Sequence, residues 1–280
     1  MHSDTDVLSW SKRDFWLCLA RAFAPPGGAD YLTAFAADLP GDLEAIAEET
    51  GLVLSAEVRD FAAAARQLNG PIELQKLYAS LFLTPPTPVM ANTCIYIDGG
   101  LMGQSEQGLQ EAYARHGFER HKHFRDLNDT VGVQSDFLAL LYDKAGIRAK
   151  AGDEIEARAY LTEAESFIAS YPCRWISPFL HDLENVCRGH ALNPVYVHLA
   201  RMLWLAIEGS MQAPQIHELH DGAALLPAGS ARGIGALTAE DLAEIAFRLE
   251  QDGLTWDHVA RNEGWDDEVF AARRAIGTSA

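Results

Sequence analysis

Histidines gather in one part of the sequence, where they could bind a metal ion. His116, His121 and His123 fall within eight residues, and Cys94 precedes them. Imidazole and thiolate are common ligands of transition metals. Cations are interspersed with these histidines and disfavour a metal ion: Arg115, Arg120, Lys122 and Arg125. The sequence therefore predicts a solvated loop here, with no metal site.

Two His-Asp dipeptides are the other residues that could do chemistry. His181-Asp182 and His220-Asp221 resemble the His-Asp pair of metal-dependent phosphohydrolases, which are also all-helical. The common nucleotide and hydrolase motifs are absent: there is no G-x-x-x-x-G-K-[ST], no strand followed by G-x-G-x-x-G, no G-x-S-x-G and no H-E-x-x-H. Because dipeptides of common residues arise by chance, a phosphohydrolase is only the alternative. We expect no enzyme and no cofactor.

Charge limits the class of partner. The chain of 280 residues has 22 basic and 40 acidic residues, a formal charge of −18. This field repels nucleic-acid phosphates and anionic lipid, and it attracts basic peptides. An acidic surface also simply keeps many proteins soluble. We therefore expect no nucleic-acid partner, and the charge alone does not require a basic ligand.

Cysteine usage and the start of the chain indicate the compartment. The four cysteines are spread out with no C-x-x-C pair, which is typical of free thiols in a reducing environment. The acidic start of the chain lacks the pattern of a secretory signal, and no run of about 20 apolar residues could span a membrane. These features predict a cytoplasmic protein.

The elements that must position any site centre on residues 73–141. A helix is expected over 73–82, because Leu74, Leu77, Leu81 and their neighbours form a broad apolar face. Prolines end it, and the connection over 84–105 is unusually long. This connection is rich in Ile, Leu, Met and Tyr, so we expect an ordered loop that lines something.

Helices are expected throughout the rest of the chain, since no sustained period-two alternation indicates a sheet. The other expected helices begin at Val7, Asp30, Asp42, Ser55, Ser105, Asp153, Trp175 and Asn193, with one capped by Asp129. The sequence predicts an all-α fold of about ten helices. Residues 1–211 form one helical bundle, 212–237 a linker or flexible loop, and 238–280 a C-terminal helical extension.

Several of these elements carry motifs of a known family. Leu81-Phe82 ends the first central helix, Cys94-Ile95-Tyr96-Ile97-Asp98 lies in the long connection before Gly103, and Tyr113 precedes Gly117-Phe118. In order and spacing these motifs resemble those of the TorD/DmsD-type redox enzyme maturation proteins.

Two further family motifs match only in part. The family's P-D-H-x-x-x-E-L-x-F run is represented here by Asp129 and Phe137, without the proline, the histidine or the glutamate. In the family's F-L-x-x-H-L-x-x-W run, Tyr171 replaces the histidine and Trp175 is retained. The resemblance covers residues 8–211, and its departures fall on polar positions.

The resemblance implies a cytoplasmic chaperone for a molybdopterin-dependent oxidoreductase. Such a protein binds the twin-arginine signal peptide of the precursor and holds it back from export until the molybdenum cofactor is inserted. A twin-arginine signal joins positive charge to an apolar segment, which suits an acidic chain with an apolar loop. A helical adaptor unrelated to redox enzymes is a further alternative.

The candidate peptide-binding residues fall into two groups. The apolar segment is assigned to Leu81, Phe82, Tyr96 and Trp175, and the arginines are assigned to Asp98, Asp129 and Asp136. Leu81 and Phe82 also fit a plain core, and Asp129 also fits a helix N-cap with no role in binding.

Overall fold

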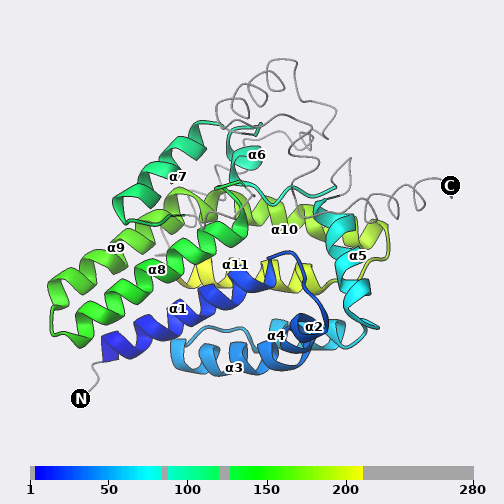
Figure 1. The fold of residues 1–280 in the computed structure, drawn as a ribbon, viewed down its shortest axis with the longest axis horizontal. Coiled ribbons are helices and arrows are strands. Elements are labelled where there is room, and N and C mark those ends of the chain that lie inside the picture. The colour runs from blue at the N-terminus through cyan, green and yellow to red at the C-terminus, as the bar shows by residue number, and fades with distance from the viewer. Residues whose placement is uncertain (1–3, 84–87, 102, 120–126, 211–280) are drawn as a thin grey trace. The chain divides into compact units, whose positions relative to one another are not determined.

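Eleven α-helices and one π-helical turn make up the described part of the chain, which comprises residues 4–83, 88–101, 103–119 and 127–210 of a computed structural model (Figure 1). The elements are α1 (Asp4–Ala22), α2 (Ala29–Thr33), the π-helix η1 (Ala34–Asp38), α3 (Leu39–Thr50), α4 (Ser55–Ala65), α5 (Pro71–Phe82), α6 (Thr93–Ile97), α7 (Gln104–Arg115), α8 (Val131–Lys150), α9 (Glu154–Ser170), α10 (Pro172–Gly189) and α11 (Val195–Ser210). Strand pairing within these residues is limited to one antiparallel bridge between Asn92 and Thr130. The predicted all-α class is confirmed. The predicted linker and C-terminal extension lie outside the described residues.

The long helices α1 and α8 lie side by side, with α9 next to α8 (Figure 1). Gly146 allows the close approach of α1, and Gly132 also faces that helix. A Cβ atom at Gly146 would lie 2.4 Å from Nε1 of Trp10, and one at Gly132 would lie 3.6 Å from the carbonyl oxygen of Ala20. Both glycines therefore face α1 from the same side of α8, so a larger side chain at Gly146 would push the two helices apart.

Aromatic rings join α7, α8 and α9 in the core. The ring of Phe137 on α8 lies 4.8 Å from that of Tyr113 on α7 and 4.7 Å from that of Phe167 on α9, in edge-to-face arrangements. Phe118 adds a third ring 5.5 Å from Phe137. Such pairs contribute beyond the burial of their area, so this cluster fixes the position of α7.

Two helix ends have well-defined capping geometry. Gly117 ends α7 in the left-handed conformation at φ 66°. The amide of Phe118 donates to the carbonyl of Tyr113 (2.9 Å), and the two rings lie 5.1 Å apart, which is a Schellman-type end with its hydrophobic contact. At the start of α11, the amide of Val195 donates to the side chain of Asn193 (3.1 Å).

Two predicted boundaries are wrong. The helices expected over 30–39 and 42–50 run together without a gap, because η1 connects α2 to α3. Pro40 falls in the first turn of α3, where a missing N–H costs nothing. The connection over 84–105, expected to be a loop, contains α6.

The N-cap of α8 is also displaced by one residue from its predicted place. Thr130, not Asp129, caps this helix, and its hydroxyl accepts from the amide of Val133 (3.4 Å). Asp129 instead accepts a hydrogen bond from the first turn of α6. The helix expected to begin at Trp175 begins instead at Pro172, the first residue of α10, a position that proline favours.

Tyrosine hydroxyls gather around the C-terminal carbonyls of α1. Tyr31 donates to the carbonyl of Arg21 (2.8 Å), and Tyr78 donates to that of Phe23 (3.3 Å). Tyr196 is fully buried beside them, yet its hydroxyl has no hydrogen-bond partner among the described residues. A buried hydroxyl without a partner costs free energy.

Removing the Tyr196 hydroxyl should therefore not destabilise the protein. We expect Tyr196→Phe to leave the free energy of unfolding unchanged or to raise it, by up to about 1–3 kcal/mol. The matched change Tyr78→Phe removes a hydroxyl that is bonded and should cost about 0.5–1.5 kcal/mol. Urea unfolding of the two variants measures both values, and a larger loss at Tyr196 than at Tyr78 would contradict this assignment.

Candidate functional site

A buried carboxylate holds the short helix α6 in place. Asp129 is 2% exposed. Its Oδ1 accepts from the side-chain amide of Asn92 (2.8 Å), and its Oδ2 accepts from the backbone amide of Cys94 (3.0 Å) in the first turn of α6. The backbones are joined as well, since the amide of Thr93 donates to the carbonyl of Asp129 (3.0 Å). A negative charge at a helix N-terminus is favourable, so Asp129 caps α6 from outside that helix.

Gln134 extends this network to α10. Its amide group donates to the hydroxyl of Thr93 and to the carbonyl of Asp129 (3.1 Å). Its carbonyl oxygen accepts from Nε1 of Trp175 (3.3 Å). All four residues are buried, and a satisfied buried network specifies one arrangement of the elements that it joins. Helices α6, α8 and α10 are therefore held together by named polar contacts.

One stripe of α10 faces α6. Trp175, Phe179 and Asp182 stand at i, i+4 and i+7, which is one helix face. The ring of Tyr96 lies 5.7 Å from that of Trp175 and nearly parallel to it, at 26°. It lies 6.3 Å from Phe179, and its hydroxyl donates to Oδ2 of Asp182 (3.0 Å). Tyr96 thus contacts all three residues of the stripe.

Phe82 reaches the same stripe from the end of α5. Its ring is stacked on that of Phe179 at 6.4 Å. We call Phe82, Tyr96, Trp175 and Phe179 the aromatic shelf. Trp175 and Phe179 are fully buried, whereas Phe82 and Tyr96 are half-buried. The shelf therefore combines two fully buried aromatic residues with two that are partly exposed.

Asp182 lies at the edge of the shelf and is half-buried. Burial raises its pKa, while the hydrogen bond from Tyr96 and the nearby His181 act in the opposite direction. Burial, followed by the Asp182 charge, raises the pKa of the Tyr96 phenol well above its ordinary value. Tyr96 therefore stays a neutral donor, and Asp182 has lost part of its hydration.

Asp98 lies at the C-terminal end of α6 and is exposed. Its carboxylate accepts from the amide (2.9 Å) and the hydroxyl (3.0 Å) of Ser105, in the first turn of α7. A Cβ atom at Gly103 would lie 2.3 Å from Oδ2 of Asp98, so this tight turn requires glycine. Beside it is an open hollow of about 420 Å³, lined by Ile97, Asp98, Gln104, Ser105, Ser170, Tyr171 and Arg174.

The seven predicted site residues are only partly brought together. Phe82, Tyr96 and Trp175 meet in the aromatic shelf, and Asp98 ends the helix that carries Tyr96. Asp129 is buried at the other end of that helix.

The other two predicted residues lie apart from the shelf. Leu81 is completely buried in the core. Asp136 is half-buried on the side of α8 near Arg21 of α1. Burial raises the pKa of Asp136, and Arg21 partly offsets this. Whether each of the seven residues binds peptide stays a prediction.

Two members of the site are additions to the prediction. Phe179 connects Phe82 to Tyr96, and Asp182 accepts the Tyr96 hydrogen bond. Their helical spacing from Trp175 is visible in the sequence, but the sequence does not show which face of α10 meets α6. Asp182 was considered only as half of a His-Asp metal pair, and its neighbour His181 is exposed.

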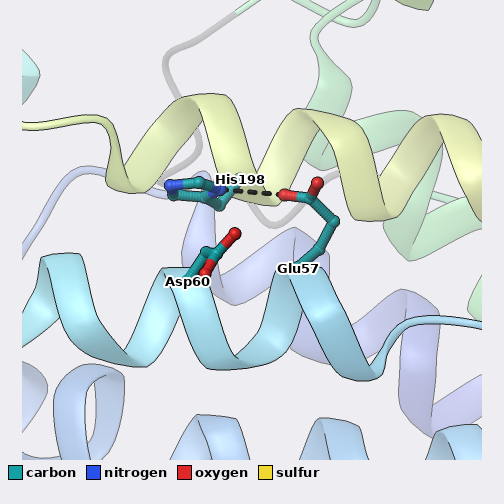
Figure 2. A group of neighbouring side chains, drawn as sticks. All are labelled: Glu57, Asp60 and His198. Atoms are coloured by element: carbon teal, nitrogen blue, oxygen red, sulfur yellow. Dashed lines mark hydrogen bonds and ion pairs between the residues drawn. The ribbon is translucent and has the colours of Figure 1, made fainter.

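A group of possible metal ligands lies between α4 and α11 (Figure 2). One ligand atom from each of Glu57, Asp60 and His198 falls within 4.8 Å of the others. Nδ1 of His198 lies 2.8 Å from Glu57 Oε2, and Arg201 lies 3.5 Å from Glu57 Oε1. A guanidinium beside the central carboxylate disfavours a cation there. We interpret the group as a polar contact between two helices.

His116 does not belong to that group. His116 lies 3.5 Å from Glu163 of α9. His121, His123 and His220 lie outside the described residues.

Comparison with known proteins defines first a class and then a family. The all-α architecture of the described residues defines the class of all-helical proteins. Residues 41–181 match the family model described as the nitrate reductase delta subunit. This match spans half of the chain, so the chain belongs to the nitrate reductase delta subunit family. The resemblance to redox enzyme maturation proteins is thereby confirmed. No curated protein and no solved structure matches the chain.

The matched region contains most of the site. It begins in α3 and ends at His181 of α10, so that it includes the whole aromatic shelf. Asp182 stands one residue beyond it.

Asp129→Asn should destabilise the fold although it preserves the shape of the side chain. The amide group of the new asparagine would face either the Asn92 amide or the Cys94 amide, both donors. Losing a charge-assisted bond and pairing two donors should lower the free energy of unfolding by about 1.5–3 kcal/mol. Chemical denaturation measures this loss. Unchanged stability would show that Asp129 does not hold α6.

Asp136→Asn should have the opposite effect. Because burial raises the pKa of Asp136, ionisation of this side chain opposes folding. The cost to stability is fully present above the raised pKa of the folded state. It is lost as the pH falls below the ordinary pKa of an aspartate. We therefore expect the asparagine variant to be as stable as the wild type or more stable at pH 7. The difference should disappear as the pH falls to about 3. Thermal unfolding at both pH values tests the sign, and a variant less stable at pH 7 would contradict it.

Proposed function

We propose that this protein is a cytoplasmic chaperone that binds the twin-arginine signal peptide of a molybdoenzyme precursor until the cofactor has been inserted. Membership of the nitrate reductase delta subunit family implies a chaperone in molybdoenzyme maturation. The proposal makes the protein a binding partner of an enzyme, not an enzyme itself. Among the described residues, no helix has both the length and the apolar character needed to cross a bilayer.

The observation that carries the proposal is the aromatic shelf with a carboxylate at its edge. A signal peptide of this kind offers two guanidinium groups followed by an apolar segment. The half-buried rings of Phe82 and Tyr96 offer apolar area at the surface, and Asp182 offers negative charge beside them. The two halves of the ligand thus have counterparts within one surface.

Apolar burial and charge would contribute differently to binding. Fully burying a large apolar side chain is worth about 1.5–3 kcal/mol, whereas an exposed ion pair adds about 0–1 kcal/mol. The net charge of −18 would mainly accelerate the encounter with a cationic peptide. The proposal therefore assigns most of the affinity to the apolar segment and orientation to the arginines.

The predicted residues take different parts in this proposal. Phe82 and Tyr96 would contact the apolar segment, because they are the half-buried members of the shelf. Trp175 and Asp129 would position them from below, through the base of the shelf and the start of α6. Asp98 stands at the other end of α6 and would add charge nearby.

Leu81 and Asp136 would act at a distance from the bound segment. Leu81 would support Phe82 from the core. Asp136, near α1, would contribute only to the long-range field.

Direct binding of a synthetic peptide to the full chain tests this function. The peptide carries a twin-arginine signal, and the comparison peptide has serines in place of its apolar residues. We expect the wild type to bind the twin-arginine peptide and to show no binding of the serine-substituted peptide, since apolar burial supplies the affinity. Isothermal titration calorimetry measures both. A wild-type protein that ignores both peptides would disprove the proposal.

The shelf itself is tested by Phe82→Ala. Loss of about 1.4 kcal/mol of apolar contact should weaken peptide binding about tenfold. Leu83→Ala is the matched control, because Leu83 is the next residue and is exposed. Equal effects of the two changes would place the peptide elsewhere.

A further inference from the structure

Asp182 is a partly desolvated carboxylate without a cation. Its Oδ2 accepts the hydrogen bond from Tyr96, and no ion pair to it occurs within the described ranges. Glu184, two residues further along α10, differs in this respect. Its Oε1 accepts from Nε (3.1 Å) and Nη2 (2.6 Å) of Arg201. Among the contacts of the described residues, the same helix therefore carries one carboxylate that holds a guanidinium and one that does not.

The surroundings of Asp182 favour a planar cation as its ligand. The hydrogen bond from Tyr96 occupies one oxygen and fixes the orientation of the carboxylate, which leaves Oδ1 for a ligand. A carboxylate that has lost hydration attracts a cation more strongly than an exposed one does. The ring of Tyr96 adjoins it, and a guanidinium stacks on aromatic faces better than an ammonium group does.

The other acidic candidates are less suited to this role. Asp129 is 2% exposed and accepts from Asn92 and Cys94. Asp98 is exposed, and both of its oxygens accept from Ser105. Asp136 is near Arg21 and belongs to a different face of the bundle.

We propose that Asp182, oriented by Tyr96, is the carboxylate that binds an arginine of the signal peptide, while the following apolar residues lie on the shelf toward Phe82. This inference rests on the proposed function and names the specificity-determining residue of the same site. Asp182 stands one residue outside the region matched by the family model, so the assignment comes from the contacts of this chain. Tyr96 acts here as a positioning residue for the carboxylate.

The test compares Asp182→Asn with the wild type in the full chain. Asparagine keeps the shape and can still accept the Tyr96 hydrogen bond, so the fold is retained. Thermal unfolding confirms this for each variant. We expect the affinity for the twin-arginine peptide to fall about tenfold or more. Affinity for a peptide with both arginines replaced by glutamine should be the same in wild type and variant, as a double-mutant cycle requires.

Two further variants separate charge from position. Glu48→Gln removes one negative charge from an exposed site on α3 and should leave binding unchanged. Tyr96→Phe should reduce the preference of the protein for the twin-arginine peptide over a peptide with lysines in place of both arginines. The same change should not alter that preference when Asp182 is already asparagine. A purely structural role of Tyr96 would instead lower binding of both peptides equally in both backgrounds.

The outcomes are distinct. If the wild type binds the peptide and Asp182→Asn binds it equally well, the inference is overturned while the proposed function stands. The same holds if Asp98→Asn, and not Asp182→Asn, abolishes the preference for arginine. If the wild type binds no twin-arginine peptide, both proposals fall.

Discussion

The buried carboxylate of Asp129 is the interaction on which the surface of this protein depends. An ionised group inside a protein is tolerated only when its oxygens are hydrogen-bonded. Here the donors come from Asn92 and from the first turn of α6. The need to satisfy one charge therefore determines where a five-residue helix begins. A helix of that length is far too short to be stable by itself.

The position of α6 in turn creates the aromatic shelf. Tyr96 stands two residues after Cys94, whose amide donates to Asp129, and that register directs its ring onto Trp175 and its hydroxyl to Asp182. The two carboxylates illustrate how burial assigns roles to the same chemical group. Asp129 is buried and each of its oxygens accepts a hydrogen bond, so its role is structural. Asp182 is only half-buried, and the hydrogen bond from Tyr96 engages only its Oδ2.

Much of the helical framework could be predicted because it is encoded locally. Apolar periodicity located the long helices, and the end of α7 at Gly117 and Phe118 depends only on residues next to each other in the sequence. The start of α6 could not be found in this way. Its cap, Asp129, is 35 residues from Cys94 in sequence, and five residues are too few to show a period. The π-helical connection before Pro40 was missed for a similar reason, since no local signal distinguishes it from a break.

Only the members of the candidate site that lie in the family motifs could be predicted from the sequence. Phe82, Tyr96 and Trp175 were assigned together by resemblance, and packing brings them together through Phe179. Asp136 shows what resemblance could not provide. It is two residues from Gln134, and two positions along a helix point in nearly opposite directions. Gln134 therefore meets Trp175, while Asp136 lies near Arg21.

Two glycines near the start of α7 pack closely against neighbouring side chains. Gly103 already lies against Asp98, and Gly108 on α7 lies so close to the Tyr171 hydroxyl that an added Cβ atom would be 2.3 Å away. The end of α6 is therefore joined to the start of α7 by the contacts of Asp98 with Ser105, and any side chain at Gly103 would have to displace Asp98.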